Sequence, residues 1–284
     1  MKVALAGCRK VGTWGIGGEG DRPWERDDKP LVEALRARGA TVSTPAWDDP
    51  GVDWASFDTV LIRATWDYHH HRDAFVAWAE RVGAATRLLN PAPIIAWNTV
   101  KTYLRDLPVP QPETVWIERA EEVRPALAER GWGTAFLKPI VGATAEGTLR
   151  FDDASVAEDH VRRLGGHFLL QPYLATVGDV GERSAIVIGG EVTHAVRKLP
   201  VPGDYRVQDD YGATDEPATL TEAELELVAA TMRALPEPVA YARVDWLTDD
   251  EGQPRLIELE LVEPCLFFRH GPGAAERLAD IVRG

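Results

Sequence analysis

The sequence predicts a mixed protein of the α/β and α+β classes, with a parallel sheet first and two further sheets after it. Three observations support this prediction. Up to residue 90, short apolar segments alternate with helical segments, which is typical of a parallel sheet. After Val109-Pro-Gln-Pro112, shorter strands and helices indicate a small sheet. From residue 182 onward, longer strand-like segments indicate antiparallel pairing. We therefore expect three regions, at residues 1–90, 91–170 and 171–284.

The composition narrows the classes of protein. The 284 residues are 45% hydrophobic and 27% charged, as in ordinary globular proteins. No run of 18 apolar residues predicts a membrane span, and the apolar start is too short for a signal peptide. The net charge of −14 argues against nucleic acid and anionic membranes as partners. The two cysteines, Cys8 and Cys265, predict neither a disulfide framework nor a zinc site, so we expect a cytoplasmic protein.

The first region contains four predicted strands and two predicted helices. The strands are at residues 3–6, 41–43, 59–63 and 87–89, and the helices are at 29–38 and 71–82. Ligands of parallel sheets bind at the carboxyl ends of strands, where the loops 8–28 and 64–71 lie. The first loop has a glycine-rich stretch at 12–20 that does not match a dinucleotide fingerprint, because the helix begins too late. A mobile substrate loop and plain surface disorder both remain open for it. The run His69, His70 and His71 favours a helix start or solvated turn over a metal site.

The later regions begin with a connector that is mostly helical over residues 94–107. We predict strands at 114–117, 134–138, 147–151, 168–171, 182–188, 191–196, 239–247 and 255–261. We predict helices at 121–130, 154–164, 220–235 and 273–282.

Three carboxylates near the C-terminus are predicted to lie on one face of a β-hairpin. Asp249-Asp-Glu-Gly252 has turn composition, and alternate residues of a strand share a face, so Glu258 and Glu260 project together. Asp245 on the partner strand can lie opposite them. Three close carboxylates repel unless a cation lies between them, and hard oxygen ligands suit Mg²⁺. A solvated acidic face is the alternative, but Arg243 and the flanking apolar residues favour the metal site.

A lysine and a loop of small residues indicate a phosphate site. Lys138 ends a predicted strand, and the loop from Gly142 to Gly147 follows it. Glycines allow backbone N–H groups to approach phosphate oxygens, although the order of residues is not that of a Walker loop. An ordinary β-turn is the alternative. The strand at 168–171 then runs into a linker with Pro172, whose backbone could bind an adenine edge or serve as a simple hinge.

The order of these features along the chain resembles the ATP-grasp superfamily, which clamps ATP between two α+β subdomains. The series runs from Lys101 and Lys138 through the glycine-rich loop to Arg243, Asp245, Glu258 and Glu260. The resemblance covers residues 90–284, and the N-terminal sheet resembles the domain that usually precedes an ATP-grasp fold. The segments 97–101, 205–212 and 258–264 are similar to a bacterial branch that includes glutathione synthetase-like proteins and cyclo-ligases that close O-ureido-serine into cycloserine.

The resemblance implies a role for each matching residue. Lys101 and Lys138 would bind the α- and β-phosphates, and Gly142, Thr144 and Gly147 belong to the loop over the β- and γ-phosphates. The adenine would lie against Gln171, Pro172, Tyr173 and Leu174, and the ribose against Asp179 or Glu182. Asp245, Glu258 and Glu260 would hold Mg²⁺, with Mn²⁺ as an alternative, although the family more often has Asn at the last position. Arg243 and one of Arg197 or Lys198 would stabilise the transferring phosphoryl group and the later oxyanion. By loop position, Thr65, Trp66, Asp67, Tyr68 and Arg206 would enclose the substrate.

This resemblance implies an ATP- and Mg²⁺-dependent carboxylate–amine ligase that acts through an acylphosphate on a small amino-acid-like substrate. Such chemistry needs no nucleophilic side chain, and no serine or cysteine arrangement stands out in the sequence. A nucleotide-binding module without catalysis and a small-molecule kinase are the alternatives. The expected partners are a small carboxylate and an amine. The superfamily is often dimeric, and an exposed face of the N-terminal sheet could pair with a second copy.

Overall fold

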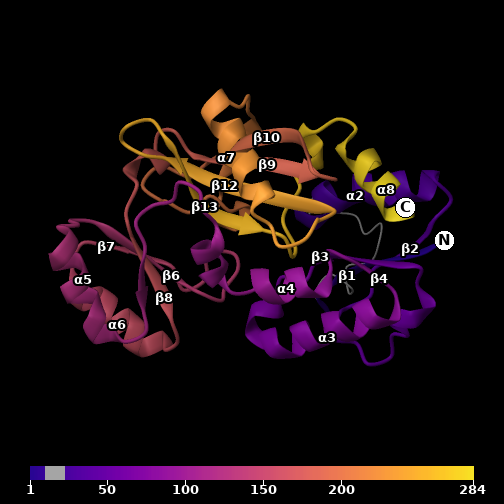
Figure 1. Cartoon of the computed structure of the whole chain (residues 1–284), viewed down its shortest axis with the longest axis horizontal. Coiled ribbons are helices and arrows are strands. Elements are labelled where there is room, and N and C mark those ends of the chain that lie inside the picture. Colours follow the sequence, from indigo (N-terminus) through magenta and orange to yellow (C-terminus); the bar gives the residue numbers. More distant parts are fainter. Residues whose placement is uncertain (10–22) are drawn as a thin grey trace.

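The computed structural model describes residues 1–9 and 23–284 of the chain, which form three sheets in the described part. The predicted glycine-rich stretch at 12–20 lies outside the described residues. Figure 1 shows the N-terminal sheet at one end of the molecule, the small sheet at the other end, and the large antiparallel sheet above and between them. Among the described helices, none is both long and apolar enough to cross a membrane.

The N-terminal sheet is parallel, with the strand order β2-β1-β3-β4, as the alternation predicts. Its elements are β1 (Lys2–Gly7), α2 (Pro23–Ala37), β2 (Thr41–Ser43), β3 (Thr59–Ala64), α3 (Arg72–Ala85) and β4 (Arg87–Leu89). Alternate residues of β1 face opposite cores: Val3 and Leu5 pack with α2, whereas Ala4 and Ala6 pack with Phe75 of α3. The C-terminal helix α8 (Ala274–Arg283) packs beside α2, so both ends of the chain share one core (Figure 1).

The small sheet has the order β5-β8-β6-β7 and is antiparallel throughout. Its elements are β5 (Val115–Ile117), α5 (Val123–Arg130), β6 (Ala135–Pro139), β7 (Leu149–Phe151), α6 (Ala154–Leu164) and β8 (Phe168–Pro172). Both helices cover one face of this sheet and share its apolar core, which leaves the other face toward the middle of the molecule (Figure 1).

The large sheet has the order β11-β10-β9-β12-β13, again antiparallel. Its elements are β9 (Glu182–Ile188), β10 (Glu191–Leu199), β11 (Thr214–Pro217), α7 (Glu222–Arg233), β12 (Tyr241–Thr248) and β13 (Pro254–Glu260). Residues of α7 pack with β9, β12 and β13 in one core, and the connector from the first region joins the same core through Tyr103 and Leu104.

Three local predictions differ from the structure. Helix α2 begins at Pro23 rather than near residue 29, because Pro30, which is typical of a first helical turn, lies inside the helix. The connector is α4 (Ala92–Asn98) followed by a 3₁₀ helix (Lys101–Asp106), because Val100 between them is extended. Strand β11 was not predicted, since its polar sequence Thr-Asp-Glu-Pro lacks an apolar alternation and lies at the sheet edge.

Candidate functional site

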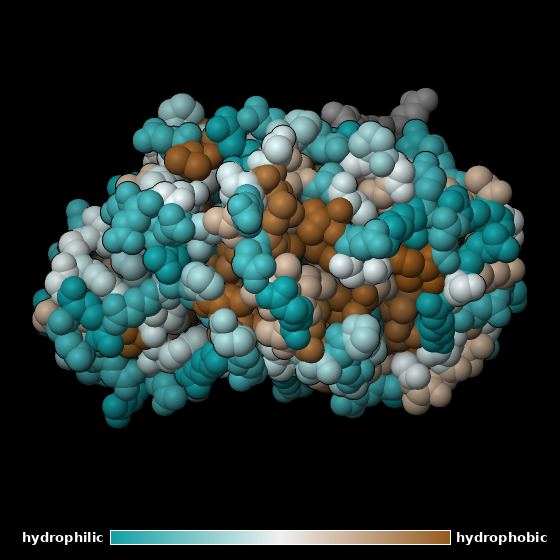
Figure 2. Space-filling model, turned by 45° about the horizontal axis from the view of Figure 1, so that its top comes forward, coloured by the Kyte–Doolittle hydropathy of each residue, from teal (hydrophilic) through white to brown (hydrophobic). Residues whose placement is uncertain are grey.

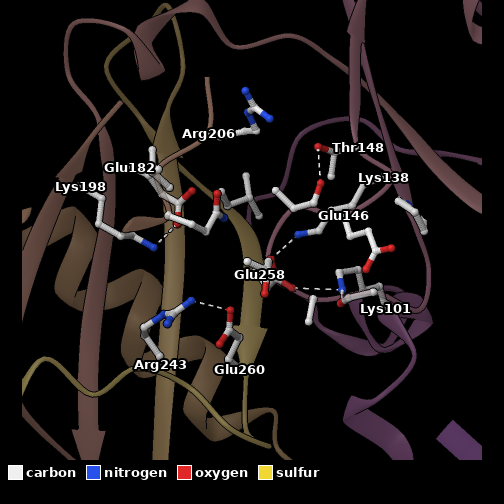
Figure 3. A pocket seen from close by; sticks show the side chains of 18 of the residues that line it. Lys101, Lys138, Glu146, Thr148, Glu182, Lys198, Arg206, Arg243, Glu258 and Glu260 are labelled. Atoms are coloured by element: carbon white, nitrogen blue, oxygen red, sulfur yellow. Dashed lines mark hydrogen bonds and ion pairs between the residues drawn. The ribbon is translucent and has the colours of Figure 1, made fainter. Parts of the chain in front are cut away.

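A cavity of about 630 Å³ lies where the three sheets meet. Its walls come from the loops after β1 and β3, from β6 with its following loop, from the end of β8, and from β9, β10, β12 and β13. Figure 2 shows hydrophobic side chains gathered in a broken band across the middle of one face, between more hydrophilic ends. The charged side chains of the cavity are grouped in Figure 3, with Glu258 near the centre.

The hairpin of β12 and β13 brings the predicted carboxylates to one part of the sheet. Asp245 lies directly opposite Glu258, and Arg243 lies opposite Glu260. Glu258 and Glu260 line the cavity, as expected from their alternate spacing. Asp245 is only 1% exposed, and it accepts a hydrogen bond from Ser184 on the neighbouring strand. The two glutamates therefore face the cavity, whereas Asp245 lies behind them.

Two lysines from the small-sheet side contact Glu258. The Lys101 Nζ lies 3.3 Å from Glu258 Oε1, and the Lys138 Nζ donates to the other carboxylate oxygen. Lys101 also donates to the Gly142 carbonyl at 2.8 Å, so it connects the hairpin to the glycine-rich loop. Although burial opposes ionisation, Lys101 and Lys138 hold the pKa of Glu258 well below its usual range. Burial also lowers the pKa of Lys101.

A second charged group joins β9, β10, β12 and β13. The Arg243 Nε lies 3.0 Å from both oxygens of Asp245, and its Nη2 donates to Glu260. Lys198 contacts Glu182 and lies 3.5 Å from Asp245 Oδ1. Burial raises the pKa of Glu260 to about 7, although Arg243 favours its charged form. Despite burial, Asp245 and Glu182 raise the pKa of Lys198.

The carboxylate oxygens of these residues are the type of ligand that a hard divalent cation prefers. Glu258 and Glu260 provide oxygen atoms on the same face of β13, and each is now neutralised by lysine or arginine. Asp245, Glu258 and Glu260 do not gather within 4.8 Å of one another in the described structure. Of the described residues, His69, His70 and Glu146 form such a group, because a 3₁₀ helix (Tyr68–His71) places the histidines beside the glycine-rich loop. The histidine run lies in this 3₁₀ helix directly before α3, so of the two structures that the sequence favoured it is a helix start rather than a solvated turn.

The glycine-rich loop and the β8 linker form another wall of the cavity. Gly142 and Thr144 line it, and Thr144 has a φ of 53°, a backbone conformation that is rare outside glycine. Gly147 lies outside the lining, where an added Cβ would be 2.9 Å from the Pro139 Cγ. All four predicted adenine contacts, Gln171, Pro172, Tyr173 and Leu174, line the cavity. Gln171 is fixed by a 2.8 Å hydrogen bond that it donates to Thr114.

Three other predicted site residues are directed away from the cavity. Arg197 is next to Lys198 and therefore projects to the opposite face of β10, where its Nη2 lies 2.8 Å from Glu216. Asp179 is exposed outside the lining, which leaves Glu182 as the ribose candidate that lines it. Thr65 is fully buried and accepts a turn hydrogen bond from the backbone of Tyr68.

The predicted substrate residues Trp66, Asp67, Tyr68 and Arg206 do line the cavity. The Arg206 Nη2 lies 2.6 Å from Asp204, and its guanidinium is 3.8 Å from the centre of the Tyr211 ring. The Tyr211 hydroxyl donates to the Thr144 carbonyl at 3.3 Å. The segment 204–211 thus contacts the glycine-rich loop across the cavity.

The predicted site residues do not include four acidic residues that line the cavity, Glu146, Asp209, Asp210 and Glu263. Glu146 belongs to the glycine-rich loop, and its carboxylate lies 2.9 Å from the His69 Nε2. Glu263 follows β13 by three residues, so the alternation that links Glu258 to Glu260 stops before it. Only the tertiary structure brings Glu146 to His69 of the N-terminal region and Glu263 to the cavity, and no local pattern in the sequence indicates either.

The two antiparallel sheets face each other across this cavity, the small sheet with Lys138 and the glycine-rich loop and the large sheet with the carboxylates. That arrangement defines an ATP-grasp enzyme, and comparison with known proteins agrees. Residues 100–247 match the family described as "Prokaryotic glutathione synthetase, ATP-grasp domain", and residues 3–90 match "D-cycloserine synthetase DcsG, N-terminal domain". The chain belongs to the glutathione synthetase-like ATP-grasp ligases that carry this N-terminal domain.

Individual relatives cover nearly the whole chain. The cycloserine biosynthesis protein DcsG of Streptomyces lavendulae is 32% identical over an alignment of 280 residues, and the match covers 90% of this chain and 93% of DcsG. The crystal structure of D-cycloserine synthetase DcsG superposes with a TM-score of 0.86 at 30% identity, over 99% of this chain and 98% of that one. A probable alpha-L-glutamate ligase of Xanthomonas axonopodis pv. citri is 27% identical, over 81% of this chain and 83% of that ligase. The protein is an ATP-grasp carboxylate–amine ligase that uses ATP and a divalent metal.

Proposed function

We propose that this ligase uses Mg²⁺ and ATP to convert the carboxylate of a small amino-acid-like substrate into an acylphosphate, which an amine then attacks. The observation that carries the proposal is the shared pairing of Glu258 with Lys101 and Lys138. Two ammonium groups around one carboxylate are positioned to exchange partners. They would turn to phosphate oxygens when nucleotide binds, and Glu258 would then be free for a cation.

The proposed roles follow the walls of the cavity. Lys101, Lys138 and the loop of Gly142 and Thr144 bind the phosphates, whereas Gln171 to Leu174 and Glu182 bind adenine and ribose. Glu258 and Glu260, with Asp245 behind them, would hold Mg²⁺, which supplies positive charge against the phosphate oxygens. Mn²⁺ offers the same charge and is the alternative metal. This assignment is supported by hard oxygen donors that line the cavity beside the lysines.

The chemistry requires that negative charge be stabilised twice. A carboxylate is a poor electrophile because it has no good leaving group, and phosphorylation provides one. Arg243 lines the cavity beside Glu260, where its guanidinium can donate to the phosphoryl oxygens and later to the tetrahedral oxyanion. Lys198, on the cavity face of β10, is the second candidate for that role.

The substrate proposal rests on the relatives. The DcsG N-terminal family covers residues 3–90, which contribute Trp66, Asp67 and Tyr68 to the cavity. This similarity supports ring closure of an O-ureido-serine-like substrate to a cyclic amide as the first reaction to test. Ligation between two separate molecules is the second. Cys8 and Cys265 are not joined in a disulfide, which is consistent with the cytoplasmic location that we propose. Light scattering would test for a homodimer.

The decisive experiment measures ADP release by the purified protein over a panel of amino acids that includes O-ureido-D-serine, with Mg²⁺ or Mn²⁺. Mass analysis of the active reactions should show a new C–N bond. A persistent phosphorylated product without that bond would instead indicate a kinase. The Lys138→Met variant should fold normally, bind ATP at least about tenfold more weakly and release ADP on the order of 100-fold more slowly. Normal turnover by Lys138→Met would contradict the assigned role.

A further inference from the structure

Glu263 differs from the other acidic residues at the centre of the cavity in its partners. The basic side chains that line the cavity, Lys101, Lys138, Lys198, Arg206 and Arg243, each pair with an acidic residue. Within residues 1–9 and 23–284, Glu263 makes neither a hydrogen bond nor an ion pair, although it lines the same cavity. Among the described residues, none supplies a hydrogen bond or an ion pair to the Glu263 carboxyl group.

The surroundings of Glu263 place it at the junction between the N-terminal sheet and the end of β13. After burial, its charge is the strongest influence that raises the pKa of Tyr68, ahead of Glu260 and Glu258. The charges of Arg243 and Arg63 act to lower the pKa of Glu263, but Arg63 pairs with Asp28 at 2.7 Å and Arg243 with Asp245 at 3.0 Å.

The environment of Glu263 is unfavourable for a carboxyl group that has no partner. Burial and the neighbouring Glu260 raise the pKa of Glu263 well above its usual value. Glu263 is half-buried, and a carboxyl group that is partly withdrawn from water without a partner lowers stability unless a ligand supplies one. A cationic ligand would remove this cost by pairing with the carboxylate.

We infer that Glu263 binds the ammonium group of the substrate, an amino acid whose carboxylate is activated beside Glu260 and Arg243. This inference rests on the proposed function and specifies its substrate class. Glu263 lies three positions after Glu260, a span of at most about 10 Å of backbone. Only a small molecule can place a carboxylate at one end of that span and an ammonium group at the other. Trp66 and Tyr68 form the wall beside it.

The test compares an amino acid with the same acid lacking its amino group, using the Glu263→Gln variant. Calorimetry with Mg²⁺ and a non-hydrolysable ATP analogue present measures O-ureido-D-serine against 3-(ureidooxy)propanoate, and D-alanine against propanoate. Wild type should bind at least one of the two amino acids with an affinity at least about tenfold higher than that for the matching acid without an amino group. The Glu263→Gln variant should lose that preference. Its affinity for the acid without an amino group should be unchanged, and it should retain its affinity for the ATP analogue. Glu251→Gln, an exposed glutamate in the β12–β13 turn, is the matched control and should keep the wild-type preference.

Three results would overturn the inference. One is a Glu263→Gln variant that still prefers the amino acid, and another is an equal loss of affinity for both acids. The third is a wild-type protein that prefers neither amino acid over its partner. A separate measurement, ADP release, tests the proposed function. A wild-type protein that discriminates through Glu263 but releases no ADP contradicts ligation and leaves the ammonium site intact.

Discussion

Replacement of Glu258 by glutamine tests the charge arrangement at the centre of the site. The change removes one negative charge from between Lys101 and Lys138 and leaves a side chain of the same shape. At 3.3 Å, the attraction between Lys101 and Glu258 is about 5 kcal/mol at an effective dielectric constant of about 20. Glu258 is 21% exposed and Lys101 7%, so water recovers part of this energy.

We expect the free energy of unfolding of ligand-free Glu258→Gln to fall by about 2–3 kcal/mol, somewhat less than the typical cost of breaking a fully buried pair. For a chain of this size, that loss lowers the melting temperature by roughly 4–10 °C. ADP should restore more stability to the variant than to wild type when no metal is present, because phosphate then neutralises two unpaired lysines. Turnover should fall on the order of 100-fold.

Thermal unfolding by scanning calorimetry, with and without ADP, provides the measurement. The control is Glu226→Gln, whose exposed carboxylate pairs with Arg233 at 2.6 Å on α7, and it should cost less than about 1 kcal/mol. The double variant Glu258→Gln with Lys138→Met should regain stability, because it removes one of the two facing ammonium groups. Equal melting temperatures for Glu258→Gln and Glu226→Gln would refute the reasoning.

Three further predictions concern other walls of the cavity. Lys198→Met should lower ADP release at least about tenfold more than Arg197→Met, because only Lys198 faces the cavity; equal losses would contradict this placement. Gly147→Ala should lower the free energy of unfolding by about 1–3 kcal/mol, because Gly147 has a φ of +71° and an added Cβ would crowd Pro139. A denaturant titration measures this loss. Gly133→Ala is the control and should not show it, since an added Cβ there meets open space. Arg206 holds the pKa of Asp204 well below its ordinary 3.8, so this pair should stabilise the protein above about pH 4 and lose that effect as the pH falls further. The stability difference between wild type and Asp204→Asn, followed by urea unfolding at pH 7 and pH 3, should therefore shrink at pH 3; an unchanged difference would exclude this linkage.

Local patterns in the sequence predicted most of the individual elements and the placement of Glu258 and Glu260 on one face of a strand. The parallel N-terminal sheet, the antiparallel β12–β13 hairpin and the pairing of Asp245 with Glu258 follow from alternation and turn composition. The lysine at the end of β6 and the following glycine-rich loop were also predictable, because strand, lysine and loop are adjacent in sequence. The roles of these residues in binding remain predictions.

The direction in which side chains project and the depth at which they are buried were harder to predict from the sequence. The sequence placed Arg197 and Lys198 together as alternatives, and only the position of β10 between β9 and β11 showed that Lys198 faces the cavity. Asp245 shares the predicted face of the hairpin, yet β9 covers it with Ser184 on one side and Arg243 beside it. Burial of this kind depends on which strand becomes the neighbour, and short-range patterns do not contain that information.

The sequence by itself determined the order of strands and helices, the alternation that groups Glu258 with Glu260, and the resemblance that indicates an ATP-grasp ligase. Only the tertiary structure decided which charges meet. Lys138 and Glu258 are 120 positions apart, and Glu146 meets His69 across 77 positions, because the three sheets converge on one cavity. Backbone periodicity acts over a few residues, whereas the packing of sheets brings distant residues together, and the electrostatics of this site depend on that packing.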